Sequence, residues 1–406
     1  MIWYPIFIVL IFILAIFNNS ISKKILYPPT LVCLIWVLVI SLHYLYNIFS
    51  KYKPDQLNFK TLLFFFIVLV FYSLGSFIAN GTKNKDLPIV TKQYKMKKNF
   101  LRFLFFFSVI NLFSFIAKIY EVVGKFDLRL FRYYTSVERI DIGLVKYTIY
   151  INIFIAILFA INFFSSSSSK TIEKFSLLIV VLIALTTSVL SSSRGTVLLL
   201  VLSIAGIYSQ YRKINGEKLF KAIGLLLSVF VGMAVVLKKS IPNSSSDKLL
   251  IFDRIEHLFY FYICLPLSAF NDFINKPYEI LYGDILFRFP NAIMYKLGLI
   301  NSPPTKLVES YVLVPDGVNV YTAYYKLVKD FGVIYVLIFM LIFSYLHSSL
   351  FFKSKKSFVS LIMYSVLLFP CVMLFFEEHL ISLLSTWLQF LIYAFLAKTF
   401  LIKNNE

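Results

Sequence analysis

Long apolar segments follow one another along almost the whole chain and are separated by short polar loops. A helix needs about 20 predominantly apolar residues to cross the hydrocarbon core of a bilayer. Segments of this kind lie at 2–18, 25–48, 61–79, 100–118, 147–164, 175–192, 195–209, 219–238, 323–350, 358–376 and 381–402. The pattern therefore predicts an all-α polytopic integral membrane protein with about 11 transmembrane helices.

The sixth and seventh segments are separated by only two residues and require a reason to be drawn as two helices. As a single helix, residues 175–209 would be about 52 Å long, whereas the hydrocarbon core is about 30 Å thick. We expect the break at the polar sequence SSSRG, residues 191–195. This break places Arg194 at the tip of a tight helical hairpin.

The predicted helices divide the chain into three parts. Residues 1–238 hold helices one to eight, with a first polar loop at 119–145 between the fourth and fifth. Residues 239–322 form a loop much longer than helix packing requires, and its periodicity predicts short helices within it. Residues 323–406 hold the last three helices.

The charged residues of the loops indicate how the helices are oriented. Loops 80–99, 210–221 and 351–357 are rich in lysine and arginine, and by parity they share one side, which the positive-inside rule assigns to the cytoplasm. Loop 119–145 and segment 239–319 carry both signs in near balance and fall outside, together with Arg194. Loop 49–60 carries three lysines and also falls outside. It is the one discordant loop, which leaves an error in the first two helices open.

The composition changes this picture little. Its hydrophobic content of 59% exceeds the roughly 45–50% of soluble domains. The formal net charge of +20 lies mainly in short loops, which is typical of membrane orientation and argues against a nucleic-acid partner. Cys33, Cys264 and Cys371 are isolated in the sequence, so neither a disulfide framework nor a zinc site is expected.

Candidate chemistry gathers on the predicted outer side. Asp253 and His257, and likewise Asp284 and Arg288, are four residues apart and share a helical face, although each pair is also typical of a local structural contact. Two further motifs have structural interpretations: the cluster 377–379 (Glu-Glu-His) as an interfacial cap, and 330–332 (Asp-Phe-Gly) as a turn or part of the ninth helix. Outward arginines suit a lipid-linked diphosphate, because the planar guanidinium binds phosphate oxygens bidentately. A nearby carboxylate or histidine can then take a proton from an acceptor hydroxyl.

Three segments resemble the repeat-unit polymerases of O-antigen and capsular polysaccharide, the Wzy-type integral membrane glycosyltransferases. SVLSSSRGTVLLLVLS resembles the family's Ser-Arg-Gly hairpin, LYGDILFRFPNAI its Gly–Arg–Pro patch, and GVNVYTAYYKLVKDFGVIYVLIF its Asn/Thr-rich approach to the next helix. Arg132, followed after ten residues by Gly143, fits a spacing found in some members. The second external loop departs from it, because Arg288 and Gly298 are one residue too close.

The resemblance implies an enzyme of the bacterial cytoplasmic (inner) membrane, crossing it many times, with an active site that faces outward. It would transfer a growing glycan from polyprenyl diphosphate onto a lipid-linked repeat unit, without a cofactor or a metal. Arg194 and Arg288 would bind the donor diphosphate, and Asp316 or His257 would be the base. The site would be shaped by Arg132, Asn319, Tyr321, Thr322 and Asp330.

The partners implied are the lipid-linked glycan donor and acceptor and the bilayer itself, together with a flippase and a chain-length regulator. Two alternatives stay open. A repeat-unit flippase or other transporter would need charged residues inside the membrane helices and two similar halves, neither of which is conspicuous here. A glycan ligase of the same fold would use the same arginines for a different acceptor.

Overall fold

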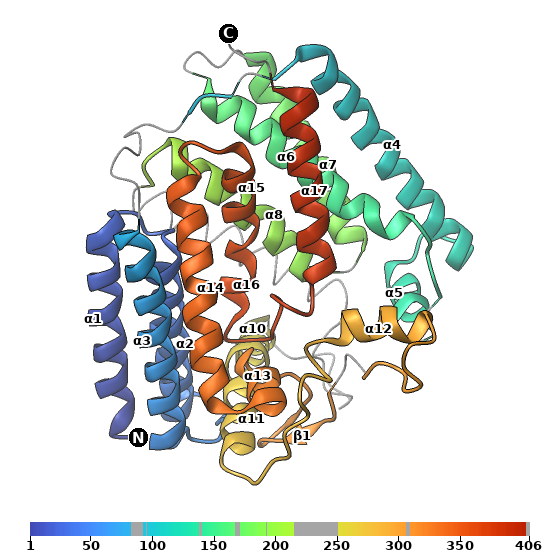
Figure 1. Cartoon of the computed structure of the whole chain (residues 1–406). Coiled ribbons are helices and arrows are strands. Elements are labelled where there is room, and N and C mark those ends of the chain that lie inside the picture. Colours follow the sequence, from blue (N-terminus) through green and yellow to red (C-terminus); the bar gives the residue numbers. More distant parts are fainter. Residues whose placement is uncertain are drawn as a thin grey trace. The chain divides into compact units, whose positions relative to one another are not determined.

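The computed structural model describes residues 1–82, 92–94, 96–136, 138, 140–166, 171–191, 193–214, 251–305 and 309–402. The regular structure of these residues is helical apart from one β-hairpin (Figure 1). Seven of the described helices are long and apolar enough to cross a membrane: α1 (Trp3–Ser22), α2 (Pro28–Phe49), α3 (Phe59–Gly81), α4 (Lys98–Val123), α6 (Val145–Ser165), α7 (Thr171–Leu190) and α14 (Val333–Lys353). The protein is an all-α polytopic membrane protein.

The predicted number of 11 transmembrane helices is not confirmed. The segment predicted at 195–209 forms α8 (Arg194–Tyr211), and the one at 381–402 forms α17 (Leu384–Leu401), but neither is among the seven candidates. The segment at 358–376 forms two short helices, α15 (Phe358–Val366) and α16 (Leu368–Met373). The eighth predicted helix, 219–238, lies outside the described residues.

The ninth predicted helix, 323–350, is also corrected by the structure. It is split into α13 (Tyr324–Phe331) and α14 at Gly332, whose φ is +82°. The left-handed region is open to glycine at no steric cost, and a glycine in this conformation commonly ends a helix. Asp330 and Phe331 are therefore the last residues of α13, Gly332 separates it from α14, and α13 is a separate element before the membrane-spanning one.

Short helices fill the described part of the long loop, as its periodicity predicts. These are α10 (Ile251–Phe259), the π-helix η1 (Tyr260–Cys264), α11 (Leu265–Ile274) and α12 (Arg288–Lys296). They are followed by the antiparallel strands β1 (Val312–Leu313) and β2 (Gly317–Val318), in which Val312 pairs with Val318. In the loop predicted at 119–145, α5 (Leu128–Ser136) is the one helix of the described residues.

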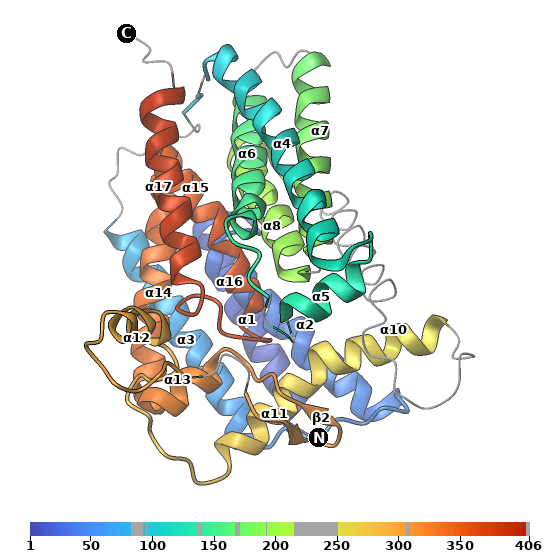
Figure 2. The same ribbon diagram turned by 90° about the vertical axis from the view of Figure 1, so that its right-hand side faces the viewer.

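The chain packs into two compact units that are each discontinuous in sequence. Unit 1 comprises Met1–Lys85, Ser240–Phe352 and Pro370–Ser385, and unit 2 comprises Asp86–Lys239, Lys353–Phe369 and Thr386–Glu406. In unit 1, α1, α2 and α3 lie side by side, and in unit 2, α6 packs against α4, α7 and α8 (Figure 2).

Aromatic side chains form the centre of the core of unit 1. The ring of Trp36 in α2 lies 4.5 Å from that of Phe65 in α3, and Phe65 lies 5.4 Å from Phe270 in α11. Tyr324 of α13 stacks on Trp36 with 5.5 Å between ring centroids. All four side chains are fully buried. This cluster fixes α11 and α13 against the membrane helices α2 and α3.

One end of unit 1 joins loop 50–58 to helices α10 and α11. The Lys51 ammonium lies 2.5 Å from the Asp253 carboxylate, and the Thr61 hydroxyl donates to the Asn271 side chain at 2.7 Å. The Lys60 ammonium donates to the carbonyl of Ile274 at 3.1 Å. Loop 49–60 thus lies on the same side as the long loop, as parity requires. The positive charge of this loop departs from the positive-inside rule because two of its lysines, Lys51 and Lys60, make contacts within the protein.

The opposite end of unit 1 is where the chain turns between α1 and α2. The ring of Tyr27 packs on Phe351, near the end of α14, at 4.9 Å. Because α14 runs from Val333 to Lys353, residues that precede it lie at the other end, beside loop 50–58. Lys23 and Lys24 therefore lie at the end of unit 1 where α14 ends.

The basic loops of unit 2 also meet at one end. The backbone N–H of Lys92 donates to the carbonyl of Lys355 at 2.8 Å, and the Tyr211 hydroxyl donates to the carbonyl of Lys92 at 3.2 Å. The described parts of the three loops predicted to share a side are thus in contact. Arg194 begins α8 and lies at the end opposite to Tyr211. Arg132 lies in α5 at that same opposite end, because α5 follows α4, which begins at the basic end.

Labelling of single cysteines tests this arrangement. In a background without the three buried native cysteines, Lys53→Cys and Glu279→Cys should react with a membrane-impermeant maleimide in intact cells, whereas Lys353→Cys should react only after permeabilisation. All three positions are exposed. Labelling of Lys53→Cys on the side of Lys353→Cys would contradict the shared side of loop 50–58 and the long loop.

Candidate functional site

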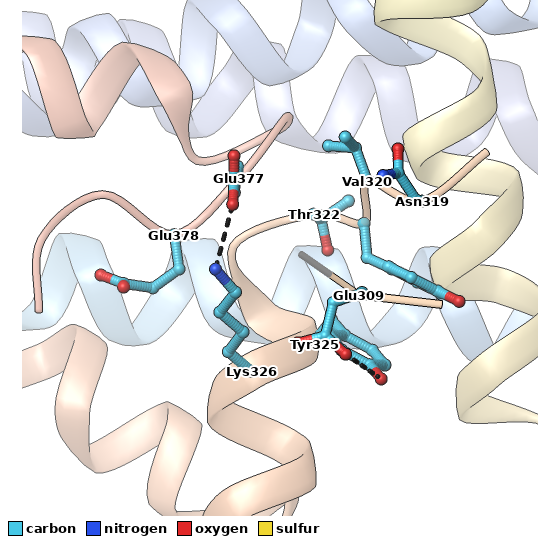
Figure 3. A pocket seen from close by; sticks show the side chains of 9 residues that line it. Glu309, Asn319, Val320, Thr322, Tyr325, Lys326, Glu377 and Glu378 are labelled. Atoms are coloured by element: carbon cyan, nitrogen blue, oxygen red, sulfur yellow. Dashed lines mark hydrogen bonds and ion pairs between the residues drawn. The ribbon is translucent and has the colours of Figure 1, made fainter. Parts of the chain in front are cut away.

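A small polar pocket lies in unit 1 at the end opposite to Lys23 and Lys24. It is partly open to solvent, and its enclosed space has room for about one water molecule. Residue 309, the 319–326 stretch and residues 377–378 line it, and Figure 3 shows Lys326 and Glu377 turned toward each other while the Glu378 carboxylate points away from them. The lining residues are Glu309, Asn319, Val320, Tyr321, Thr322, Tyr325, Lys326, Glu377 and Glu378.

The start of α13 is the element that positions most of this lining. The backbone N–H of Ala323 donates to the carbonyl of Leu374 at 2.9 Å, which joins the 319–326 stretch to the 374–383 loop. Tyr324 turns its ring into the aromatic core behind. Residues Tyr325 and Lys326 follow on the helix and reach the pocket.

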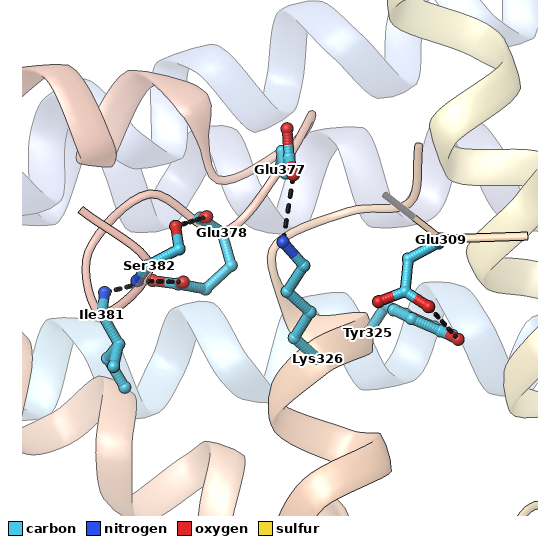
Figure 4. Close-up of polar contacts among 7 residues, drawn as sticks. All are labelled: Glu309, Tyr325, Lys326, Glu377, Glu378, Ile381 and Ser382. Carbon is cyan, nitrogen blue, oxygen red and sulfur yellow. Dashed lines mark hydrogen bonds and ion pairs between the residues drawn. The ribbon is translucent and has the colours of Figure 1, made fainter. Parts of the chain in front are cut away.

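Lys326 is a buried cation held by one carboxylate. The residue is 5% exposed, and its ammonium lies 3.0 Å from Glu377 Oε1 (Figure 4). An ammonium removed from water needs a paired charge, because desolvation otherwise costs several kcal/mol. The side chain of Glu377 is 32% exposed, so this ion pair lies at the boundary between the core and the pocket.

Glu378 serves the loop that closes the pocket. It is 3% exposed, and its two carboxylate oxygens accept the backbone N–H groups of Ile381 at 2.6 Å and Ser382 at 2.9 Å (Figure 4). The cluster 377–379 was expected to be an exposed cap. Glu378 does cap backbone donors, but it is buried. Burial lowers the pKa of His379, an effect that the neighbouring Glu377 and Glu378 oppose.

Glu309 forms the opposite wall of the pocket together with Tyr325 and Lys329. The Lys329 ammonium donates to the Tyr325 hydroxyl at 2.8 Å, and this hydroxyl donates to Glu309 Oε2 at 3.2 Å. Burial and then the charge of Glu309 raise the pKa of Tyr325. The ring of Tyr321 stacks on Tyr325 with 4.1 Å between centroids and 16° between planes.

Thr322 brings a buried hydroxyl to the same space. The residue is 1% exposed, and its Oγ1 makes no hydrogen bond with any residue that the structure describes. A buried polar group without a partner costs about 1–3 kcal/mol. Such a group beside a pocket of this size indicates a place where a water molecule supplies the partner.

Three of the residues predicted to shape the site are thus brought together: Asn319, Tyr321 and Thr322. Asp330 is not among the pocket residues. Its buried carboxylate accepts the backbone N–H groups of Leu286 at 2.7 Å and Ile285 at 3.3 Å, and burial raises its pKa. Asp330 therefore anchors the turn before α12.

Arg288, the first residue of α12, lies beyond this turn. Its Nε donates to the carbonyl of Thr305 at 2.7 Å, while Thr305 Oγ1 donates to the carbonyl of Asp284. The expected contact between the Asp284 and Arg288 side chains is replaced by these bonds to backbone. The arginines expected to bind the diphosphate belong to different units: Arg288 to unit 1, and Arg194, half-buried at the start of α8, to unit 2 with Arg132.

The two predicted bases lie near each other, outside the pocket lining. Asp316 is exposed in the turn between β1 and β2. Burial raises the pKa of Tyr260, and the hydrogen bond with Asp316 and the negative charge of Asp316 raise it further. His257 lies one helical turn before Tyr260 and faces the ring of Tyr52 at 5.1 Å. Burial lowers the pKa of His257, and the charge of Asp316 opposes this shift. Asp253, four residues before His257, forms an ion pair with Lys51.

Sequence reasoning missed four of the pocket's charged residues: Glu309, Lys326, Glu377 and Glu378. A signal was present in two of them, because Lys326 and Glu378 interrupt otherwise apolar stretches. Among the described residues, no group of three or more histidines, cysteines or carboxylates is placed to hold a metal ion.

Comparison of the chain with protein-family models, with curated proteins and with solved structures gives no match. The resemblance to repeat-unit polymerases stays a prediction from sequence motifs. The function is therefore inferred from the geometry described above.

Loss of the buried ammonium should destabilise the protein. Lys326→Met leaves the Glu377 carboxylate without its partner, so we expect a loss of about 1–3 kcal/mol in unfolding free energy, seen as a lower midpoint of thermal unfolding in detergent. The double variant Lys326→Met/Glu377→Gln should recover most of this loss. Lys276→Met, which breaks an exposed pair with Asp272, is the control and should change stability by less than about 0.5 kcal/mol. Equal losses in both single variants would refute a buried pair.

His257 should make the protein sensitive to acid. Because burial lowers its pKa in the folded state, the folded protein binds fewer protons than the unfolded chain below about pH 6.5. This contribution to stability is complete above that pH and is lost as the pH falls through the folded-state pKa. Wild type should therefore lose more thermal stability between pH 7.5 and 5.5 than His257→Gln. Equal losses would show that His257 is not shielded by Tyr52 and Tyr260.

Proposed function

We propose that the protein is a membrane glycosyltransferase that polymerises polyprenyl-diphosphate-linked oligosaccharide repeat units into a surface polysaccharide. The main support is the pocket: three carboxylates and two stacked tyrosines at the end of unit 1 that also carries the long loop. Under the positive-inside rule that end faces away from the cytoplasm. The reaction would then take place at the outer leaflet of a bacterial cytoplasmic membrane.

The side chains around the mouth of the pocket suit the hydroxyl groups of an acceptor sugar. Stacked tyrosine rings offer a flat apolar surface to a sugar ring, and carboxylates accept hydrogen bonds from its hydroxyl groups. Glu309 is our first candidate for the base, because only its Oε2 is bonded to Tyr325 and its side chain lines the pocket. Asp316 and His257, which flank Tyr260, are the second.

The transfer needs charge stabilisation at the donor. The bond between the donor's anomeric carbon and a diphosphate oxygen breaks, a bond to the acceptor oxygen forms, and the acceptor's proton passes to the base. Arg194 and Arg288 each begin a helix, where unpaired backbone N–H groups favour an anion. The guanidinium group of Arg288, which belongs to the same unit as the pocket, is our candidate for stabilising the charge that develops on the departing polyprenyl diphosphate, and Arg194 is a separate candidate for that role in unit 2.

A substitution in the source cell tests this function. Glu309→Gln keeps the size of the side chain and removes the proton acceptor. General-base catalysis contributes about 10²–10⁴-fold, so the polymer ladder of the surface glycan should disappear on a gel while single repeat units still reach the surface. Glu279→Gln, an exposed carboxylate of the same unit, is the control and should leave the ladder unchanged.

The other outcomes identify the alternatives. Loss of all surface glycan, with lipid-linked units trapped inside the cell, would indicate a flippase. Long chains that stay on polyprenyl diphosphate would indicate a ligase. An unchanged ladder in Glu309→Gln would contradict the role of Glu309.

A further inference from the structure

We propose that α12 lies in the membrane interface, with its apolar face covered by the lipids of the leaflet at which α14 begins. This placement of α12 is independent of the glycosyltransferase activity proposed above. Three observations carry it: the different composition of the two faces of α12, the lack of protein packing around this helix, and its connection to the lipid-facing surface of α14.

One face of α12 is apolar. Phe289, Ile293 and Leu297, the residue directly after the helix, are spaced four residues apart and therefore share a face. Pro290 and Met294 widen this face on one side. The side chains of Phe289, Ile293 and Leu297 are all exposed, so the protein does not cover them.

The opposite face of α12 is polar. Arg288, Asn291 and Tyr295 lie on it at spacings of three and four residues, and Lys296 stands beside them at the end of the helix. The cationic groups of Arg288 and Lys296 fit the phosphate groups of lipid headgroups. A helix divided in this way, with basic residues on its polar face, is typical of one that lies in the plane of a membrane interface, its apolar face about 5–10 Å into the boundary between headgroups and acyl chains.

Protein packing does not account for the helical conformation of α12. In the described structure, none of its nine residues is buried. Isolated helices shorter than about 12–15 residues are only marginally stable in water. A helix of this length that buries nothing against the protein needs another surface, and its exposed apolar face indicates that this surface is apolar as well.

The chain that leads into α12 is fixed at the start of α14. The ring of Phe287 lies 5.8 Å from that of Phe331 at the end of α13, and the ring of Phe331 lies 5.9 Å from that of Tyr335 in the first turn of α14. The side chains of Phe287 and Tyr335 are both exposed. An apolar surface therefore continues from α14 to the first residue of α12.

The length of α14 sets the level of this surface in the membrane. Its 21 residues correspond to about 31 Å, which matches the roughly 30 Å thickness of the hydrocarbon core. The first turn of α14, in which Ile334 and Tyr335 are exposed, thus lies at the hydrocarbon boundary. Since α12 begins beside this turn and runs across the direction of α14 (Figure 1), the lipids of this leaflet are the surface that its apolar face meets.

Fluorescence quenching on the full-length protein in phosphatidylcholine nanodiscs tests this placement. Ile293→Cys and Tyr295→Cys carry an NBD fluorophore on opposite faces of α12, at positions that the protein leaves almost equally exposed, at 46% and 44%. The three native cysteines are buried, so the parent protein gives the background labelling. A lipid nitroxide near the top of the acyl chains should quench the label at position 293 severalfold more strongly than the label at position 295, and aqueous iodide should show the reverse order.

Two other outcomes would overturn the proposal. Equal quenching of both labels by iodide would place α12 in water. A label at position 293 that neither quencher reaches would indicate that a second copy of the chain or another protein covers the apolar face.

Amide hydrogen exchange in the same nanodiscs supplies a second test that requires no label. Ile293→Ser/Leu297→Ser removes apolar contact with lipid, so the amides of α12 should exchange severalfold faster. The midpoint of thermal unfolding should stay unchanged, because both side chains are exposed and contribute nothing to the core. Tyr295→Ser, on the polar face, is the matched control and should leave the exchange unchanged. Unchanged exchange in the double variant, or a lower midpoint, would show that protein contacts hold α12 and would overturn its placement in lipid.

Discussion

The packing of Tyr324 against Trp36 and Phe65 is the contact on which the geometry of unit 1 depends. It holds α13 against two membrane helices, and the pocket residues 319–326 are part of α13 or of the chain that leads into it. Burying a ring of this size stabilises a fold by about 1.5–3 kcal/mol. That stabilisation is what permits a lysine to be buried two residues further along the helix. The packed rings of Trp36, Phe65 and Tyr324 thus hold in place the part of α13 that carries Lys326.

Two of the charged side chains that line the pocket, Lys326 and Glu378, are buried. Lys326, Glu377 and Glu378 are satisfied by one another or by backbone N–H groups, so the pocket is pre-organised before any ligand arrives. Thr322 is the exception.

Hydropathy predicted the membrane helices α1 to α4, α6 and α7 well, because an apolar run of about 20 residues is rare outside membrane-spanning helices. It missed the break at Gly332, because the residues on both sides are apolar and only the backbone conformation of the glycine separates them. The convergence of Glu309, Lys326 and Glu378 was likewise out of reach, since nothing local in the sequence connects positions 309, 326 and 378. Asn319, Tyr321 and Thr322 were within reach because they form one polar, aromatic run directly before an apolar segment.

The contacts between loop 50–58 and helices α10 and α11 join residues more than 200 positions apart, as in Lys51–Asp253 and Thr61–Asn271. At a synthesis rate of about 5–20 residues per second, roughly 10–40 s separate the first partner from the second. During that interval α1 to α3 are in the membrane while Lys51 and Lys60 are still without their partners. Helices α4 to α8 of unit 2 are made in between. Folding of unit 1 therefore requires a late segment of the chain to bind an early one. A chain that stops before Asp253 contains only the first partner of each contact.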